Sequence, residues 1–294
     1  MKLIWPWQDR SRRFSPLKAG VFALMLAPAI RLTYLEATGD FGMFAMSFGN
    51  AVYWSGVWAT VILIMALAVT PMLTIFRWSA LIEVRRMIGV TALVYTVAHI
   101  IIYFALRQWN WAFILNETLT RLSLITATLS TIGLIALGAT SLDEAIRRMG
   151  AKGWQRLHST VYVVTALALF HVLLSRGTYP EQYLLSGLFF WVMAWRALNR
   201  YDLGADARAL AVLALSTGLF AVIIEVWLSW WKRGYAPAET LANNVDFDLG
   251  VPPVWQLLAY GLLIALAAAG HQALGLRPVR LRARKVGQSL VAQD

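Results

Sequence analysis

Long apolar segments alternate with short, mostly basic segments along the whole chain. Eight apolar segments are long enough, or nearly so, to cross a hydrocarbon core about 30 Å thick at about 1.5 Å per residue of helix. They cover residues 17–35, 51–76, 87–106, 122–140, 155–174, 183–197, 210–230 and 254–274, and the sixth is the shortest. A closed barrel would instead show short stretches in which apolar and polar residues alternate. The pattern therefore predicts an all-α fold, a polytopic membrane helical bundle of about eight transmembrane helices.

The basic residues predict how this bundle is oriented. With the N-terminus in the cytoplasm, 20 of the 26 lysines and arginines fall in the cytoplasmic segments and six in the outer ones. An excess of positive charge is typical of cytoplasmic loops. Merging or deleting one helix would destroy the alternation, so the charges also support the count of eight. We expect a multi-pass membrane protein with both termini cytoplasmic, beginning with a cytoplasmic tail over residues 1–16.

Composition excludes several classes of protein. Only 14% of the residues are charged and 59% are hydrophobic, which is unlike a soluble domain of 294 residues. The absence of cysteine excludes disulfides, cysteine-ligated zinc and iron–sulfur clusters. The net charge of +11 is spread over short loops, so no nucleic-acid-binding face is expected. The chain has neither a dinucleotide-binding fingerprint nor a P-loop, so any nucleotide chemistry belongs to a separate partner.

Three histidines lie inside the apolar segments. Ionisable groups within membrane spans usually mark functional sites, and imidazole is the usual protein ligand of haem iron. His99 lies 13 residues after Arg86 and His171 lies 15 residues after Arg156, so both side chains are about 20–22 Å from the cytoplasmic ends of their helices. This equal depth makes His99 and His171 the predicted axial ligands of one haem b. His158, at the cytoplasmic rim, is the candidate ligand of a second haem or cofactor.

Helix geometry leaves alternatives open. His158 and His171 are 13 residues apart, which corresponds to about 20 Å along a helix and about 140° around it. Both side chains face one seam only if this helix is tilted, underwound or locally irregular. The competing interpretation is that the histidines are buried and hydrogen-bonded to neighbouring helices. His271, near the cytoplasmic end of the last segment, is expected to be an ordinary interfacial histidine.

Basic residues near His158 form a second set of candidates. Arginine makes strong bidentate contacts with carboxylates and phosphates. Arg85 and Arg148 are the candidates from this set for binding haem propionates or a flavin phosphate. The alternative is that these arginines only set the membrane topology.

Several of these motifs together resemble a known family. They are Arg85-Arg86-Met87-Ile88-Gly89 followed by His99, Thr70-Pro71 ending the second helix, Thr140-Ser141 closing the fourth helix, and Arg148-Met149-Gly150 followed by Trp154-Gln155-Arg156-Leu157-His158, Tyr162 and His171. The pattern resembles the MsrQ (YedZ) family of haem-binding membrane subunits, in the ferric-reductase-like transmembrane superfamily. The match is best over residues 50–175 and looser over 17–200, which is the expected six-helix core. Residues 201–294 add two helices, an outer loop and a basic cytoplasmic tail, and Thr120-Arg121-Leu122 replaces the family's Arg-Pro-Tyr.

The resemblance implies a function. It implies that His99, His158 and His171 bind haem b, and it suggests FMN as a further cofactor. Electrons would pass from a cytoplasmic flavin reductase or a quinone donor to a periplasmic oxidoreductase acceptor, such as a methionine sulfoxide reductase. The chain would then be an electron-transfer subunit rather than a self-contained enzyme.

Two other functions remain as alternatives. A transmembrane ferric or metal reductase would act directly on metal ions, and the acidic outer loop with Glu239, Asp246 and Asp248 is its candidate metal-binding surface. A haem-free transporter or scaffold is the second alternative. Broken helices and paired charges at mid-membrane would support a transporter, and the sequence indicates neither.

Overall fold

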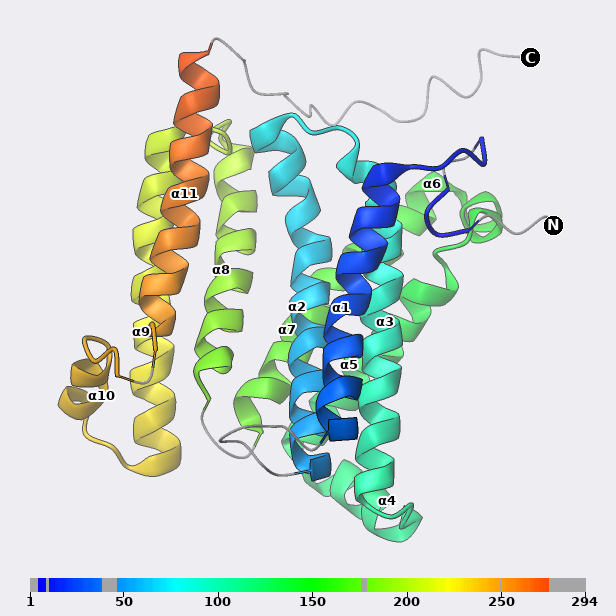
Figure 1. Cartoon of the computed structure of the whole chain (residues 1–294), viewed down its shortest axis with the longest axis vertical. Coiled ribbons are helices and arrows are strands. Elements are labelled where there is room, and N and C mark those ends of the chain that lie inside the picture. Colours follow the sequence, from blue (N-terminus) through cyan, green and yellow to red (C-terminus); the bar gives the residue numbers. More distant parts are fainter. Residues whose placement is uncertain (1–4, 9–10, 39–46, 176–178, 249, 275–294) are drawn as a thin grey trace.

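The computed structural model describes residues 5–8, 11–38, 47–175, 179–248 and 250–274, and this part of the chain is helical without any strand (Figure 1). The helices are α1 (Pro16–Thr38), α2 (Ser47–Phe76), α3 (Leu81–Leu106), α4 (Trp111–Thr120), α5 (Leu122–Ala139), α6 (Asp143–Ser159), α7 (Val161–Leu174), α8 (Pro180–Arg200), α9 (Ala207–Arg233), α10 (Pro237–Asn243) and α11 (Pro253–Ala273). The basic residues expected in the C-terminal tail, from Arg277 to Lys285, lie outside the described residues.

The long helices run side by side and confirm the predicted helical membrane bundle (Figure 1). Within the described ranges, seven spans are long and apolar enough to cross a membrane, with α6 and α7 counted as one. The remaining long helix, α8, packs against α2 and α9 and is less apolar. Its polar residues Gln182 and Ser186 are buried against other helices. A helix that is surrounded by protein needs no continuous lipid-facing surface, which explains why this segment had the weakest apolar signal.

Helix α2 is the central element of the bundle. It contributes to one core cluster with α1, α3, α5 and α7, and to a second cluster with α7, α8, α9 and α11. In Figure 1, α8, α9 and α11 accordingly lie on one side of α2, and α1 and α3 lie on the other. Close approach within the C-terminal group depends on small residues, because a Cβ on Gly261 of α11 would lie 2.5 Å from the Cβ of Ala214 in α9.

The two ends of the bundle differ. The start of α1, helix α6 and the end of α11 share one end, which we call the basic end, whereas α4 and α10 lie at the opposite end, the α4 end (Figure 1). The sequence did not predict α4 or α10, which are short and lie in segments expected to be loops. Helix α3 also begins six residues before the apolar segment predicted at 87–106, because its first turns contain polar residues and were not counted in that segment.

The fifth apolar segment was predicted as one helix over 155–174, and this was wrong in detail. Thr160 separates α6 from α7, and Gly150 interrupts α6 with a left-handed φ of 70°. The backbone of Thr160 stays close to helical values, so the chain continues in the same direction but with a local irregularity. This irregularity is one of the conditions under which both histidines of the segment can face one neighbour.

Pro71 does not end α2, which continues to Phe76 as the apolar pattern predicted. Proline has no N–H group, so the carbonyl of Leu67 lacks its usual helical partner. A side chain from α8 replaces that partner: Arg196 Nη2 donates to the Leu67 carbonyl at 3.1 Å. The guanidinium group also lies 4.7 Å from the ring centroid of Tyr162.

We expect Arg196→Met to lower the free energy of unfolding by about 1–3 kcal/mol, because it leaves a buried carbonyl without a donor. Pro71→Ala restores a backbone N–H for the Leu67 carbonyl, so the same substitution should cost less in that background. Unfolding of the four proteins in detergent, followed by circular dichroism, tests this coupling. An equal loss in both backgrounds would show that Arg196 has no specific role at the proline.

Tyr95 connects α3 to α1 in a similar way, because its side chain forms hydrogen bonds with backbone groups of the neighbouring helix. Its hydroxyl accepts a hydrogen bond from the backbone N–H of Ala29 at 3.0 Å and donates to the carbonyl of Met25 at 2.7 Å. These two backbone groups would be partners in a regular helix, so the hydroxyl is inserted into the hydrogen-bond ladder of α1. The insertion lies beside Pro28 and fixes α1 against the helix that carries His99.

Candidate functional site

A cavity of about 980 Å³ lies between α2, α3, α5 and α7. Its inner wall is apolar and includes Leu63 and Leu134, and its lining extends to Arg107 and Arg121 at the α4 end. Cavities of this size, apolar with a few convergent polar groups, are typical of ligand and cofactor sites.

His99 of α3 and His171 of α7 both line this cavity. Their ring centroids are 6.4 Å apart and their planes are inclined by 66°. The equal depth predicted from the sequence therefore brings the two imidazoles together, although the histidines are 72 residues apart in the chain.

Backbone carbonyls orient both imidazoles. The Nδ1 atom of His99 lies 2.9 Å from the carbonyl oxygen of Val52 and 3.1 Å from the hydroxyl of Ser55. The Nδ1 atom of His171 lies 2.8 Å from the carbonyl oxygen of Ser123, on the first turn of α5. A carbonyl oxygen only accepts, so each Nδ1 carries the proton and each Nε2 carries the lone pair. Metal-binding histidines commonly have this arrangement, with the other nitrogen donating to a carbonyl.

Gly56 allows the His99 ring to lie directly against α2. A Cβ built on Gly56 would lie 2.9 Å from Cε1 and 3.1 Å from Nδ1 of His99. Real Cβ atoms essentially never approach a neighbour within 3.0 Å. The absence of a side chain at this position therefore sets how deeply the imidazole can pack.

The pair of imidazoles fits one shared metal ion. Bonds between first-row metals and imidazole nitrogen are about 2 Å long, so two rings on opposite sides of one ion have centroids about 6 Å apart. The observed 6.4 Å agrees with this value. Two imidazoles at this separation, both lining an apolar cavity of this size, match the requirements of a haem with two axial histidines. The competing interpretation was that the histidines only form hydrogen bonds to neighbouring helices. This accounts for the two Nδ1 atoms, but neither Nε2 atom has a hydrogen-bond partner in the part of the chain that the structure describes.

His158 is in a different environment, at the basic end. Its Nε2 atom lies 3.1 Å from the hydroxyl of Thr140, and its ring stacks on Trp154 with centroids 4.0 Å apart. Thr140 caps the C-terminal end of α5, and Ser123 lies in its first turn, so His158 and His171 contact opposite ends of the same helix. The Nε2 atom of His158 is already hydrogen-bonded, which distinguishes it from the cavity pair.

The structure separates both predicted arginines from the cavity, and it relates only Arg85 to His158. Arg85 interacts electrostatically with His158, and it precedes His99 by 14 residues, about 21 Å of helix. Arg148 Nε donates to Glu144 at 2.9 Å, and its side chain is 78% exposed. Neither arginine lines the cavity. Their role in cofactor binding stays a prediction.

Sequence reasoning missed a charged cluster at the α4 end of the cavity. Glu117 of α4, only 8% exposed, lies 3.2 Å from Arg107 and 2.5 Å from Arg121, and it accepts a hydrogen bond from the hydroxyl of Tyr103 at 2.8 Å. Arg107 and Arg121 are two of the six basic residues that the apolar pattern places in the outer segments. A capping signal could have revealed α4, because the side chain of Asn110 accepts from the N–H of Phe113.

Known proteins provide an independent comparison. Residues 55–169 match the family model described as ferric reductase like transmembrane component. The protein-methionine-sulfoxide reductase heme-binding subunit MsrQ of Herminiimonas arsenicoxydans is 33% identical over 241 residues, which cover 80% of this chain and 94% of that relative. The chain belongs to the MsrQ family.

Two further relatives are similar to this MsrQ-family chain. The MsrQ subunit of Azospira oryzae is 29% identical over 67% of this chain and 85% of that relative. The magnetosome protein MamZ of Paramagnetospirillum magneticum is 30% identical over 60% of this chain but only 27% of its own length. No solved structure matches the chain. The matched family range includes His99 and His158 and ends two residues before His171.

His271 of this MsrQ-family chain lies apart from the cavity. Its ring faces Phe76 at the basic end, with centroids 5.9 Å apart. It does not line the cavity, and its Nδ1 atom is buried without a hydrogen-bond partner among the described residues, so an ordinary interfacial role stays a prediction.

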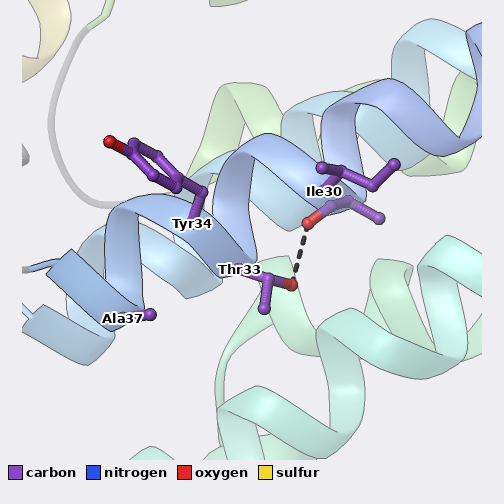
Figure 2. Close-up of a pocket in the computed structure, with 5 residues that line it drawn as sticks. Ile30, Thr33, Tyr34 and Ala37 are labelled. Carbon is purple, nitrogen blue, oxygen red and sulfur yellow. Dashed lines mark hydrogen bonds between the residues drawn. The ribbon is translucent and has the colours of Figure 1, made fainter.

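A second hollow, of about 430 Å³, lies on α1 and is lined by Ala29, Ile30, Thr33, Tyr34 and Ala37 (Figure 2). The Thr33 hydroxyl is directed back to the Ala29 carbonyl at 2.9 Å rather than into the hollow. No histidine, carboxylate or basic side chain lines it, so this hollow is not a candidate site for the MsrQ-family chain.

Proposed function

We propose that this chain is a haem b-binding electron-transfer subunit of the bacterial inner membrane that serves a methionine sulfoxide reductase. The observation that carries the proposal is the pair His99 and His171, with centroids 6.4 Å apart in an apolar cavity. The names of the MsrQ relatives support it, since they describe heme-binding subunits of a protein-methionine-sulfoxide reductase.

The residues of the cavity have separate tasks in this proposal. His99 and His171 would hold the iron through their Nε2 atoms. The carbonyls of Val52 and Ser123 accept the Nδ1 protons, which fixes both rings and raises the basicity of the ligand nitrogens. The apolar walls keep water away and lower the local dielectric constant, which tunes the redox potential. Haem b would supply a one-electron redox centre in this cavity.

The basic end is assigned to the cytoplasm by the positive-inside rule. The start of α1 and the end of α11 lie at this end, so both termini are cytoplasmic in the proposal (Figure 1). The cavity lies towards the α4 end, which then faces the periplasm. A cytoplasmic flavin reductase or a quinone supplies electrons, and a periplasmic oxidoreductase accepts them. FMN binding near His158, Arg85 and Arg148 stays a prediction.

Residues 17–200 are proposed as the electron-transfer core, with 1–16 as the N-terminal tail and 201–294 as an addition to it. Every residue that lines the cavity except Trp231 lies between residues 52 and 182. Helices α9 and α11 pack on α8 and do not contribute to the imidazole pair. In this proposal α9 and α11 therefore stabilise the core without binding the haem.

The test is the haem content of the purified full-length chain, measured as pyridine haemochrome per polypeptide, followed by reoxidation of the reduced protein with a methionine sulfoxide reductase and its substrate. We expect at least one haem per chain and reoxidation that depends on the reductase.

Reduction of ferric chelates without a partner would instead favour a metal reductase. No Soret band, even with added haem, would favour a transporter or scaffold. Among the described residues no group of three or more histidine or acidic side chains forms a metal site, so the structure adds no support for the metal reductase.

The His158→Ala variant separates the cavity pair from the basic end. Because His158 Nε2 is bonded to Thr140 and lies at the other end of α5, we expect the haem held by His99 and His171 to remain. The measurement is haem per chain together with the absorption spectrum of the reduced protein. Complete loss of haem in this variant, with its helical content unchanged, would contradict the assignment of the axial pair.

A further inference from the structure

The α4 end of the cavity carries two arginines that share one carboxylate. Arg107 and Arg121 both line the cavity, and both are ion-paired with Glu117, at 3.2 Å and 2.5 Å. Tyr103 adds a hydrogen bond to the same carboxylate. Two positive charges and one negative charge leave this cluster with a formal charge of +1. The cavity is also lined by the carboxylate of Glu181, which accepts a hydrogen bond from the Tyr53 hydroxyl at 2.5 Å.

The guanidinium groups keep unused hydrogen-bonding capacity. Each arginine has five N–H donors in a planar fork, which is suited to bidentate contact with a carboxylate. The Nε atom of Arg107 is buried and has no hydrogen-bond partner within the described part of the chain. A buried donor of a charged group without a partner is costly, so an anionic ligand in the cavity would stabilise this arrangement.

The same helices present the imidazoles and the arginines. Arg107 follows His99 by eight residues on α3, a rise of about 12 Å towards the α4 end. Arg121 immediately precedes α5, two residues before Ser123, whose carbonyl orients His171. The cationic cluster and the imidazole pair are therefore two parts of one cavity with a fixed spacing.

We propose that Arg107 and Arg121 bind the two propionate carboxylates of the haem and direct this polar edge of the porphyrin towards the α4 end. This inference rests on the proposed function, since it requires haem between His99 and His171. Glu117 positions the two guanidinium groups and leaves one net positive charge for the incoming dianion. The phosphate of a lipid headgroup has related chemistry, and the experiment separates it from the propionates.

The experiment compares haem with its dimethyl ester, which has the same iron and ring but no propionate charge. Full-length protein produced without haem is titrated with each compound in detergent, and the ratio of the two affinities is measured from the Soret band. We expect wild type to prefer haem by about tenfold or more, which corresponds to at least one charge-assisted hydrogen bond. In the double variant Arg107→Gln/Arg121→Gln the ratio should fall towards one, with the absorption spectrum still that of two axial imidazoles.

Arg31→Gln is the matched control. Arg31 is an exposed arginine in the second half of α1, and it does not line the cavity. Its substitution lowers the net charge by one, as each single arginine substitution of the cluster does, and should leave the ratio of the two affinities unchanged. Because each ratio is measured within one protein, a general loss of folded material cancels.

The outcomes distinguish the two proposals. If wild type binds both compounds equally well, or if the double variant keeps the full preference for haem, the arginines do not bind propionates, and a lipid phosphate becomes the better ligand for the cluster. If wild type binds neither compound, the proposed function itself fails. The assignment of Arg107 and Arg121 to the propionates is supported if the preference for haem over its dimethyl ester falls in the double variant but not in Arg31→Gln.

Discussion

His171→Ala should abolish haem binding, and His99→Ala should do the same. Each substitution removes one of the two imidazoles that line the cavity, and the described structure offers no other histidine there to replace it. With an axial bond lost on either face, the low-spin spectrum of a haem with two histidines cannot form. The measurement is haem per chain by pyridine haemochrome, together with the intensity of the Soret band.

His271→Ala is the matched control for both variants, because this histidine also lies on a membrane helix but outside the cavity. It should retain the wild-type haem content. Full haem in either His99→Ala or His171→Ala would refute the axial pair, and with it the observation on which the proposed function depends.

Gly56→Ala should weaken haem binding without removing any ligand. The new methyl group would lie 2.9 Å from Cε1 of His99, so the ring must move away from the Val52 carbonyl that orients it. Loss of such an orienting partner typically lowers metal affinity by about 10-fold to 100-fold. Haem titration of the protein in detergent measures the affinity, and circular dichroism measures the fold.

Gly89→Ala provides the comparison for this variant. It lies on the same helix as His99, and a Cβ there meets nothing within 4 Å. Alanine is favoured over glycine in a helix by about 1 kcal/mol, so Gly89→Ala should bind haem normally and be at least as stable as wild type. If Gly56→Ala and Gly89→Ala bind haem equally well, close packing against α2 does not control the position of His99.

Much of the fold was predictable because a membrane helix is specified by its own composition. Segments of sufficient apolar length identified the spans, and the distance of His99 and His171 from the basic end indicated their common depth. The weakest prediction concerned α8, since Gln182 and Ser186 are shielded by neighbouring helices rather than by lipid. Local composition does not reveal which residues will be covered by other parts of the chain.

Details of the site depended on contacts that the sequence does not display. The break between α6 and α7 falls at Thr160, where no proline or glycine announces it in the sequence. The role of Glu117 was hidden because α4 is a short helix in an expected loop. Arg107 and Arg121 were visible only as outer charges until the fold placed them around one carboxylate.

Helix α5 connects the two ends of the molecule in a way that has a kinetic consequence. The first turn of this helix orients His171, and the residue that ends it contacts His158. The 17 residues from Ser123 to Thr140 correspond to about 26 Å of rise. Because α5 contacts both histidines, deleting a single turn from it should shift the position of one imidazole relative to the other, and an electron tunnelling between sites at these two histidines would then cross a different distance.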